Sequence, residues 1–115
     1  MTKILVINGP NLNNLGRRDP GQYGSKTLPE IETAISNRAG ELGVDVQFFQ
    51  SNHEGELVDA IHAARGRCAG IVVNPGAFTH YAWAIHDALA AFEGPVVELH
   101  LSNPAAREPW RHTSV

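Results

Sequence analysis

The chain has 115 residues, of which 43% are hydrophobic and 18% are charged, and its formal net charge is −3. This balance predicts one globular domain, residues 1–115, with a real core. A slightly acidic chain without a basic run argues against binding to nucleic acid or to an anionic membrane. The apolar runs are too short to span a membrane. Cys68 is the only cysteine, so we expect no internal disulfide and no cysteine-based metal cluster.

The first predicted element is an apolar run, Ile4–Ile7, which is typical of a buried strand. Only three residues precede it, so we expect no signal peptide and a cytoplasmic location. A long loop, residues 8–24, follows and contains two arginines and a tyrosine. Loops of this length in small domains are usually binding loops, lids or disordered segments. Side chains that can bind an anion and transfer a proton favour a functional lid.

Strands and helices alternate along the rest of the chain. Thr27 stands three residues before Glu30, a capping-box pattern that predicts a helix start, and Thr79 is the predicted cap of a later helix. Apolar periodicity predicts the other elements. After the loop we expect helix Leu28–Leu42, strand Val44–Phe49, helix Glu54–Arg65, strand Ala69–Val73, helix His80–Phe92 and strand Val96–Leu101.

This alternation is the signature of βαβ units and a parallel sheet. With right-handed crossovers it predicts a flavodoxin-like, doubly wound α/β sheet in the order 2-1-3-4, one strand short of the usual five. Ligands of such sheets bind beyond the carboxyl ends of the strands. The polar candidates that follow strands one, three and four are Asn8, Asn11, Arg18, Tyr23, Asn74, Thr79, His80, Glu98, His100, Ser102, Arg107 and Arg111.

Each candidate also has a purely structural interpretation. Tyr23 could rest on the surface, and as a base it would need a cation such as Arg18, because free tyrosine has a pKa near 10. His100 could hydrogen-bond a backbone group within its strand. Arg107 and Arg111 would share one face of a helix, where they could either grip a carboxylate or face solvent.

Several other classes of protein are poorly supported. No G-x-G-x-x-G or Walker loop follows the first strand, so nucleotide binding is not indicated. A receiver domain would need acidic residues where Asn8 and Asn74 stand. A Schiff-base enzyme needs a buried lysine, and neither Lys3 nor Lys26 is suitably placed. No histidine or cysteine spacing indicates a metal site.

Five groups of residues occur in one order over essentially the whole chain. They are Asn8–Leu12 with Leu15–Pro20 and Tyr23-Gly24; Gln50–Asn52 with Glu54–Glu56; Asn74–Ala77 with Thr79-His80; Glu98–Asn103; and Arg107-Glu108 with Arg111-His112. Together they closely resemble the motifs of the type II 3-dehydroquinate dehydratases. No single group is decisive, but the set is highly specific.

The resemblance implies the dehydration of 3-dehydroquinate to 3-dehydroshikimate in the shikimate pathway. The reaction would pass through an enolate without metal, cofactor or Schiff base. Tyr23 would remove the proton beside the ketone, and Arg18 would stabilise the ionised phenol. Asn11 would help to hold the enolate oxygen through water, and His100 would protonate the departing hydroxyl.

The resemblance also implies the residues that bind substrate and the state of assembly. Asn74, His80 and Arg111, with the backbone around Leu101 and Ser102, would bind the ring hydroxyls and the carboxylate. Asp87 would belong to the substrate-binding residues of a neighbouring subunit's site. Glu98 and Arg107 would support the residues that contact the substrate. Asp87 could equally form a surface ion pair. The family assembles as trimers packed into dodecamers.

The chain departs from the family pattern at its carboxyl end. The family continues beyond a stretch like 111–115 with a fifth strand and a last helix, so we expect strand four to be an open edge beside uncovered apolar surface. Compared with a longer relative, we also expect this chain to be less stable or to assemble differently. The competing hypothesis is a non-catalytic, flavodoxin-like binding or assembly module. A scaffold does not need Tyr23, Arg18 and His100 together, which argues against it.

Overall fold

The computed structural model describes residues 2–15, 26–80 and 82–100. They form a parallel sheet in the order β2-β1-β3-β4, which confirms the predicted fold class and strand order. The strands are β1 (Lys3–Asn8), β2 (Asp45–Gln50), β3 (Gly70–Asn74) and β4 (Val96–Glu98). No helix within the described ranges is long and apolar enough to cross a membrane.

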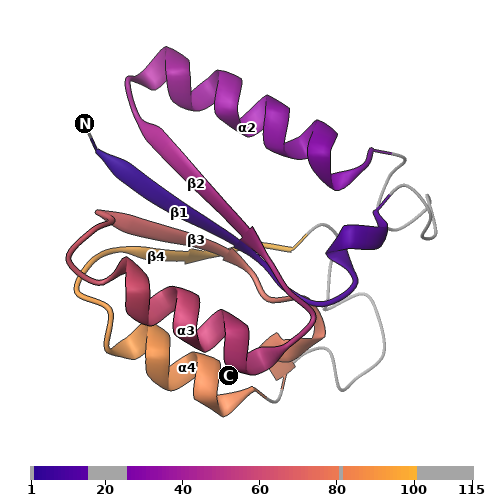
Figure 1. The fold of residues 1–115 in the computed structure, drawn as a ribbon, viewed down its shortest axis with the longest axis vertical. Coiled ribbons are helices and arrows are strands. Elements are labelled where there is room, and N and C mark those ends of the chain that lie inside the picture. Colours follow the sequence, from indigo (N-terminus) through magenta and orange to yellow (C-terminus); the bar gives the residue numbers. More distant parts are fainter. Residues whose placement is uncertain (1, 16–25, 81, 101–115) are drawn as a thin grey trace.

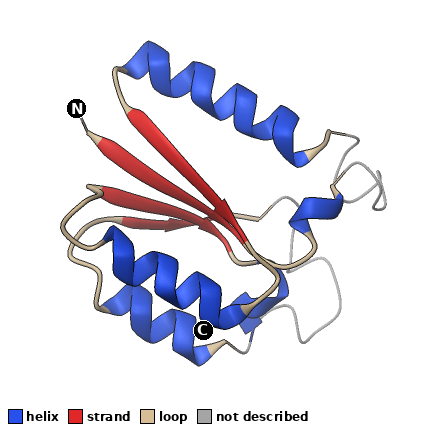
Figure 2. Ribbon diagram, in the orientation of Figure 1, coloured by secondary structure: helices blue, strands red, loops and turns tan. Residues whose placement is uncertain are grey.

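The helices cover both faces of the sheet (Figures 1 and 2). Helix α2 (Leu28–Leu42) lies on one face, whereas α3 (Glu54–Ala64) and α4 (Trp83–Ala90) lie side by side on the other. Two short 3₁₀ helices, η1 (Leu12–Asn14) and η2 (Gly76–His80), follow the ends of β1 and β3. The sheet therefore directs both of these turns to the same edge.

The main core lies between the sheet and the pair α3–α4. Strands, helices and the turn before α4 all contribute to it, through Leu5, Ile7, Leu57, Ile61, Ala64, Ile71, Val73, Ala82, Ile85, Ala88 and Phe92. A smaller cluster beneath the start of α2 contains Leu12, Leu15 and Leu28, with Ile31 packed against it. This second cluster anchors η1, the first turn of the predicted lid, to the body of the molecule.

Helix α2 begins and ends at the predicted residues. The Thr27 hydroxyl accepts a hydrogen bond from the Glu30 backbone N–H at 3.4 Å, as in a capping box, and donates to Glu30 Oε1 at 3.1 Å. Gly43 ends the helix with a φ of 71°. Apolar periodicity predicts that Ala39 and Leu42 share the inward face of this helix, but only Ala39 is buried and Leu42 is 61% exposed. Among the described residues, α2 is the only helix on its face of the sheet.

The predicted helix His80–Phe92 starts too early. Thr79 and His80 belong to η2, and α4 begins only at Trp83. The Thr79 hydroxyl does not cap α4, since it donates to Glu98 Oε1 at 2.7 Å. A contact between distant residues has therefore replaced the local cap that the sequence indicated. The helix also ends at Ala90, two residues before the predicted end, and the other boundaries before β4 agree with the predicted ones to within one residue.

Strand β4 is shorter than the predicted Val96–Leu101. The Leu99 backbone N–H still donates to Val73 O at 2.9 Å, so ladder-like bonding continues one residue beyond the strand. β4 is the terminal strand of the described sheet, and Val97 on it is 56% exposed. The expected lack of a fifth strand and last helix concerns residues from 101 onward, which lie outside the described residues.

Candidate active site

The carboxyl ends of the four strands meet at one edge of the sheet. The parallel register pairs Asn8 of β1 with Gln50 of β2 and with Asn74 of β3, and it pairs Val73 with Glu98 of β4. Asn8 and Asn74 are both buried polar residues, 8% and 5% exposed. Four polar side chains from distant parts of the sequence are therefore brought together by strand pairing alone.

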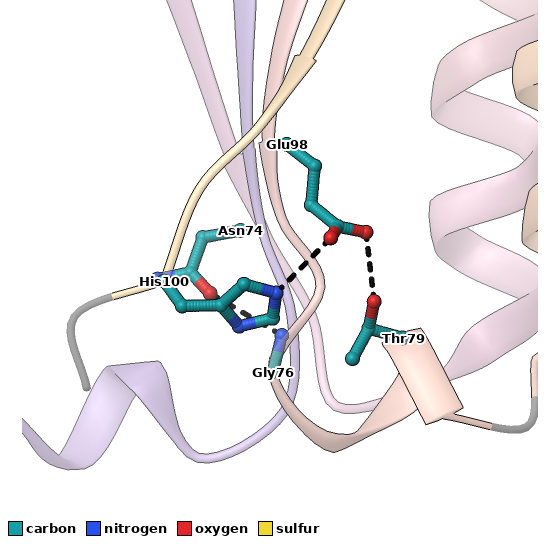
Figure 3. Close-up of polar contacts among 5 residues, drawn as sticks. All are labelled: Asn74, Gly76, Thr79, Glu98 and His100. Atoms are coloured by element: carbon teal, nitrogen blue, oxygen red, sulfur yellow. Dashed lines mark hydrogen bonds and ion pairs between the residues drawn. The ribbon is translucent and has the colours of Figure 1, made fainter. Parts of the chain in front are cut away.

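Close backbone contact joins the turns that follow β1 and β3. The Gly9 N–H donates to Asn74 O at 2.8 Å. A Cβ atom at Gly9 would lie 2.4 Å from Pro75 O, so only glycine fits there. Asn74 Oδ1 accepts from the Gly76 N–H at 3.3 Å, which orients the Asn74 amide (Figure 3).

Asn11 opens the predicted lid in a left-handed conformation, with a φ of 68°. Asparagine tolerates this region better than most residues do. Its N–H donates to Asn52 Oδ1 at 2.9 Å. Gln50 Nε2 donates to Gly9 O at 3.1 Å and to Asn52 Oδ1 at 3.3 Å. The segment after β2 thus braces the loop after β1.

The segment after β2 is itself held by hydrogen bonds at the start of α3. Ser51 is buried, and its hydroxyl accepts from the His53 N–H at 2.9 Å and hydrogen-bonds Glu56. Ser51 and Glu56 thereby hold the turn from which Asn52 extends. The sequence placed Gln50–Asn52 within a family motif, but the support that Gln50 and Asn52 give to the loop was not predicted. These hydrogen bonds span 41 residues, so no local pattern reveals them.

The Glu98 side chain contacts both η2 and the segment that follows β4 (Figure 3). Its Oε1 accepts from the Thr79 hydroxyl at 2.7 Å, and its Oε2 lies 3.3 Å from His100 Nε2. The His100 side chain is 18% exposed and that of Glu98 is 41% exposed. A carboxylate that accepts the Nε2–H leaves Nδ1 as the nitrogen that can take up or release a proton.

The structure brings together four of the predicted site residues: Asn11, Asn74, Glu98 and His100 lie at the same edge of the sheet. His80 belongs to η2, next to Thr79. Asp87 is exposed on α4 and takes no part in the contacts above. Six predicted site residues, Arg18, Tyr23, Leu101, Ser102, Arg107 and Arg111, lie outside the described residues.

The described part of the edge carries hydrogen-bonding groups and one imidazole–carboxylate pair. Within residues 2–15, 26–80 and 82–100, no group of three or more His, Cys, Asp or Glu side chains could hold a metal ion.

Sequence comparison shows similarity to dehydratases. The chain matches the family model described as dehydroquinase class II over residues 2–115. It is 60% identical to 3-dehydroquinate dehydratase 2 of Pseudomonas putida over 111 residues, which are 96% of this chain and 74% of the relative. It is 54% identical to 3-dehydroquinate dehydratase of Bacillus licheniformis, covering 100% of this chain and 79% of the relative.

Solved structures resemble this one closely. The type II dehydroquinase from Propionibacterium acnes superposes with a TM-score of 0.96 at 43% identity, and the match covers all of this chain and 79% of that one. A 3-dehydroquinate dehydratase-like protein from Bifidobacterium longum gives a TM-score of 0.71 at 34% identity, covering 93% of this chain and 78% of that one.

Proposed function

Because the chain belongs to the dehydroquinase class II family, we propose that it removes water from 3-dehydroquinate to form 3-dehydroshikimate. The observation that carries the proposal is the meeting of Asn11, Asn74 and the Glu98–His100 pair at one edge of the sheet. Relatives at 54–60% identity bear the name of the same enzyme, which supports the reaction and its substrate.

The first step is removal of the proton beside the substrate's ketone. Tyr23 acts as the base, and Arg18 on the same loop stabilises the phenolate that this role requires. Negative charge then develops on the ketone oxygen, which becomes an enolate. Asn11 holds this oxygen through a water molecule, and its fixed backbone supports the arrangement. No Schiff base or cofactor takes part.

The second step is loss of the hydroxyl group. The enolate expels it, the C–O bond breaks, and His100 delivers the proton that turns it into water. The contact between His100 Nε2 and Glu98 supports this assignment, because it orients the imidazole. Arg107, like Glu98, supports the residues that contact the substrate.

Substrate binding is assigned to groups around the same edge. Asn74, His80 and the backbone of Leu101 and Ser102 bind ring hydroxyls, and Arg111 binds the carboxylate, as guanidinium groups commonly do. Asp87 acts in the site of a neighbouring subunit within a homo-oligomer built from trimers, and the exposure of Asp87 on α4 is compatible with that.

The direct test is the ultraviolet absorbance of the conjugated product when the purified chain is mixed with 3-dehydroquinate. We expect product from the parent and none from Tyr23→Phe, which lacks the base. The variant should still bind the substrate in calorimetry, because the other binding groups remain. A parent that forms no product would contradict the proposed function. Equal loss of turnover and binding in Tyr23→Phe would contradict the assignment of Tyr23 as base.

The alternative of a non-catalytic binding or assembly module is not favoured. Its expected result is that the parent binds the substrate in calorimetry but gives no product in the absorbance assay.

A further inference from the structure

The two oxygens of the Glu98 carboxylate contact different partners, and only one of these partners has a role in the reaction proposed above. Oε2 contacts His100 Nε2, whereas Oε1 accepts from the hydroxyl of Thr79 (Figure 3). We propose that Thr79 is a positioning residue of the dehydration, which orients Glu98 so that Glu98 in turn orients His100. This inference rests on the proposed function and deepens it.

Thr79 is well suited to hold another side chain still. It is 3% exposed and lies in η2, which is tied at both ends by the hydrogen bonds Phe78 N–H to Pro75 O and Ala82 N–H to Phe78 O. Its β-branched side chain has restricted rotation about χ1. The hydroxyl is therefore a donor whose position is set by the surrounding turn.

The carboxylate of Glu98, in contrast, takes its direction from side-chain contacts. It is the last residue of β4, a strand of only three residues, and its side chain is 41% exposed. Strand register fixes its backbone opposite Val73, whereas side-chain contacts such as the one from Thr79 set the direction of its carboxylate. A hydroxyl that donates to Oε1 holds one oxygen, so the other faces His100. A hydrogen bond to an ionised acceptor is stronger than a neutral one.

The consequence for the reaction concerns the proton on His100. While Oε2 accepts the Nε2–H, the proton that His100 delivers comes from Nδ1. After the transfer, the neutral ring carries its remaining proton on Nε2, where Glu98 stabilises that tautomer. If Glu98 rotates away, the ring loses both its orientation and its tautomer preference. The chemical step then slows, but the substrate-binding groups remain.

Capping of α4 does not account for this hydroxyl. Helix α4 has Ala82 at its N-cap position, without a side-chain cap, and it begins at Trp83. Thr79 lies too early to cap it. The hydroxyl instead reaches across 19 residues of sequence to Glu98.

The test compares Thr79→Val, which removes the hydroxyl at similar shape, with Thr79→Ser, which retains it. Thr33→Val is the matched control, because the Thr33 hydroxyl bonds only to Pro29 O on the exposed side of α2, as far as the described contacts go. We expect Thr79→Val to lower kcat roughly tenfold to hundredfold while KM changes by less than about threefold. Thr79→Ser and Thr33→Val should keep kcat near that of the parent.

A second readout does not depend on turnover. Nitrogen-15 NMR of the imidazole rings distinguishes the two tautomers, and His100→Gln identifies the His100 signals by their loss. We expect the Nε2–H tautomer of His100 in the parent, in Thr79→Ser and in Thr33→Val. Thr79→Val should give a mixture of both tautomers.

Three outcomes would overturn the inference. The first is that Thr79→Val retains the kcat of the parent. The second is that Thr79→Val loses activity only because less protein is folded, and Thr79→Ser shares that loss. The third is that the His100 tautomer in Thr79→Val is the same as in the parent. An inactive parent would contradict the proposed function instead. The NMR comparison would then still decide whether Thr79 controls the His100 ring.

Discussion

At the scale of single residues, the site edge depends on positions where an ordinary side chain would not fit or would be strained. Gly9 lies against the carbonyl of Pro75, and its N–H bonds to Asn74 O. Asn11 adopts a left-handed φ of 68° while its N–H is held by Asn52. These contacts fix the two turns that carry Asn11 and Asn74, so they set the spacing of groups proposed to bind substrate.

We predict that Gly9→Ala destabilises the fold. The added Cβ would lie 2.4 Å from Pro75 O, and a backbone atom cannot move aside as a flexible side chain can. We expect a loss of about 1–3 kcal/mol in the free energy of unfolding, measured by urea denaturation.

Gly40→Ala is the matched control for this change. Gly40 lies within α2, where an added Cβ meets nothing within 4 Å. The alanine should stabilise the helix by about 0.5–1 kcal/mol. If Gly9→Ala unfolded at the same urea concentration as Gly40→Ala, the close packing of the two turns would be refuted.

At the scale of elements, local capping decides where α2 begins, whereas a distant contact decides the shape of the segment before α4. The Thr27–Glu30 capping box is local, and α2 starts where it predicts. Thr79 looks like another cap, but its hydroxyl bonds to Glu98. Two threonines in similar sequence settings therefore have different functions, because only one has a carboxylate from another strand within reach.

We predict that Thr27→Ala lowers the free energy of unfolding by about 1 kcal/mol, because the first turn of α2 loses its side-chain acceptor. Thr33→Ala in the same helix is the control. The exposed Thr33 hydroxyl bonds back to Pro29 O, and alanine is the better helix former, so this change should be neutral or slightly stabilising. Thermal or urea melts that showed equal stability for both variants would rule out the cap as a significant contribution.

At the scale of the whole molecule, a parallel sheet gathers polar residues that are far apart in sequence at a single edge. Asn11 and Asn52 are 41 residues apart, and Thr79 and Glu98 are 19 apart. Asp87, by contrast, is exposed on α4 and takes no part in these contacts. If Asp87 takes part in the reaction, as proposed, it does so across an interface between subunits.

We predict that two impaired variants complement each other. Tyr23→Phe lacks the base, and Asp87→Asn lacks the group proposed to reach a neighbouring site. Mixed oligomers contain some sites with an intact Tyr23 and a neighbour's intact Asp87, so the mixture should regain part of the parent activity. Light scattering should show an oligomer throughout.

Asp59→Asn is the control for this mixture, because Asp59 is likewise exposed, on α3. Asp59→Asn alone should be active. A mixture of Tyr23→Phe with Asp87→Asn that remained as inactive as its components would place Asp87 outside the neighbour's site.

The sequence by itself determined the order of elements, the class of fold and the family. Hydrophobic periodicity, capping and turn residues act within a few positions along the chain, and they predicted both ends of α2 correctly and most other boundaries to within one residue. The motifs also predicted that Asn11, Asn74, Glu98 and His100 belong to the site, and the fold brings these four to one edge.

Only the tertiary structure decided how these residues are held. The brace from Asn52 to Asn11, the approach of Gly9 to Pro75 and the bond from Thr79 to Glu98 all join segments that strand pairing brings together. A local pattern cannot show which distant acceptor competes for a hydroxyl or which carbonyl approaches a glycine. For this reason the predicted cap at Thr79 was wrong, and the support for the site became visible only in the fold.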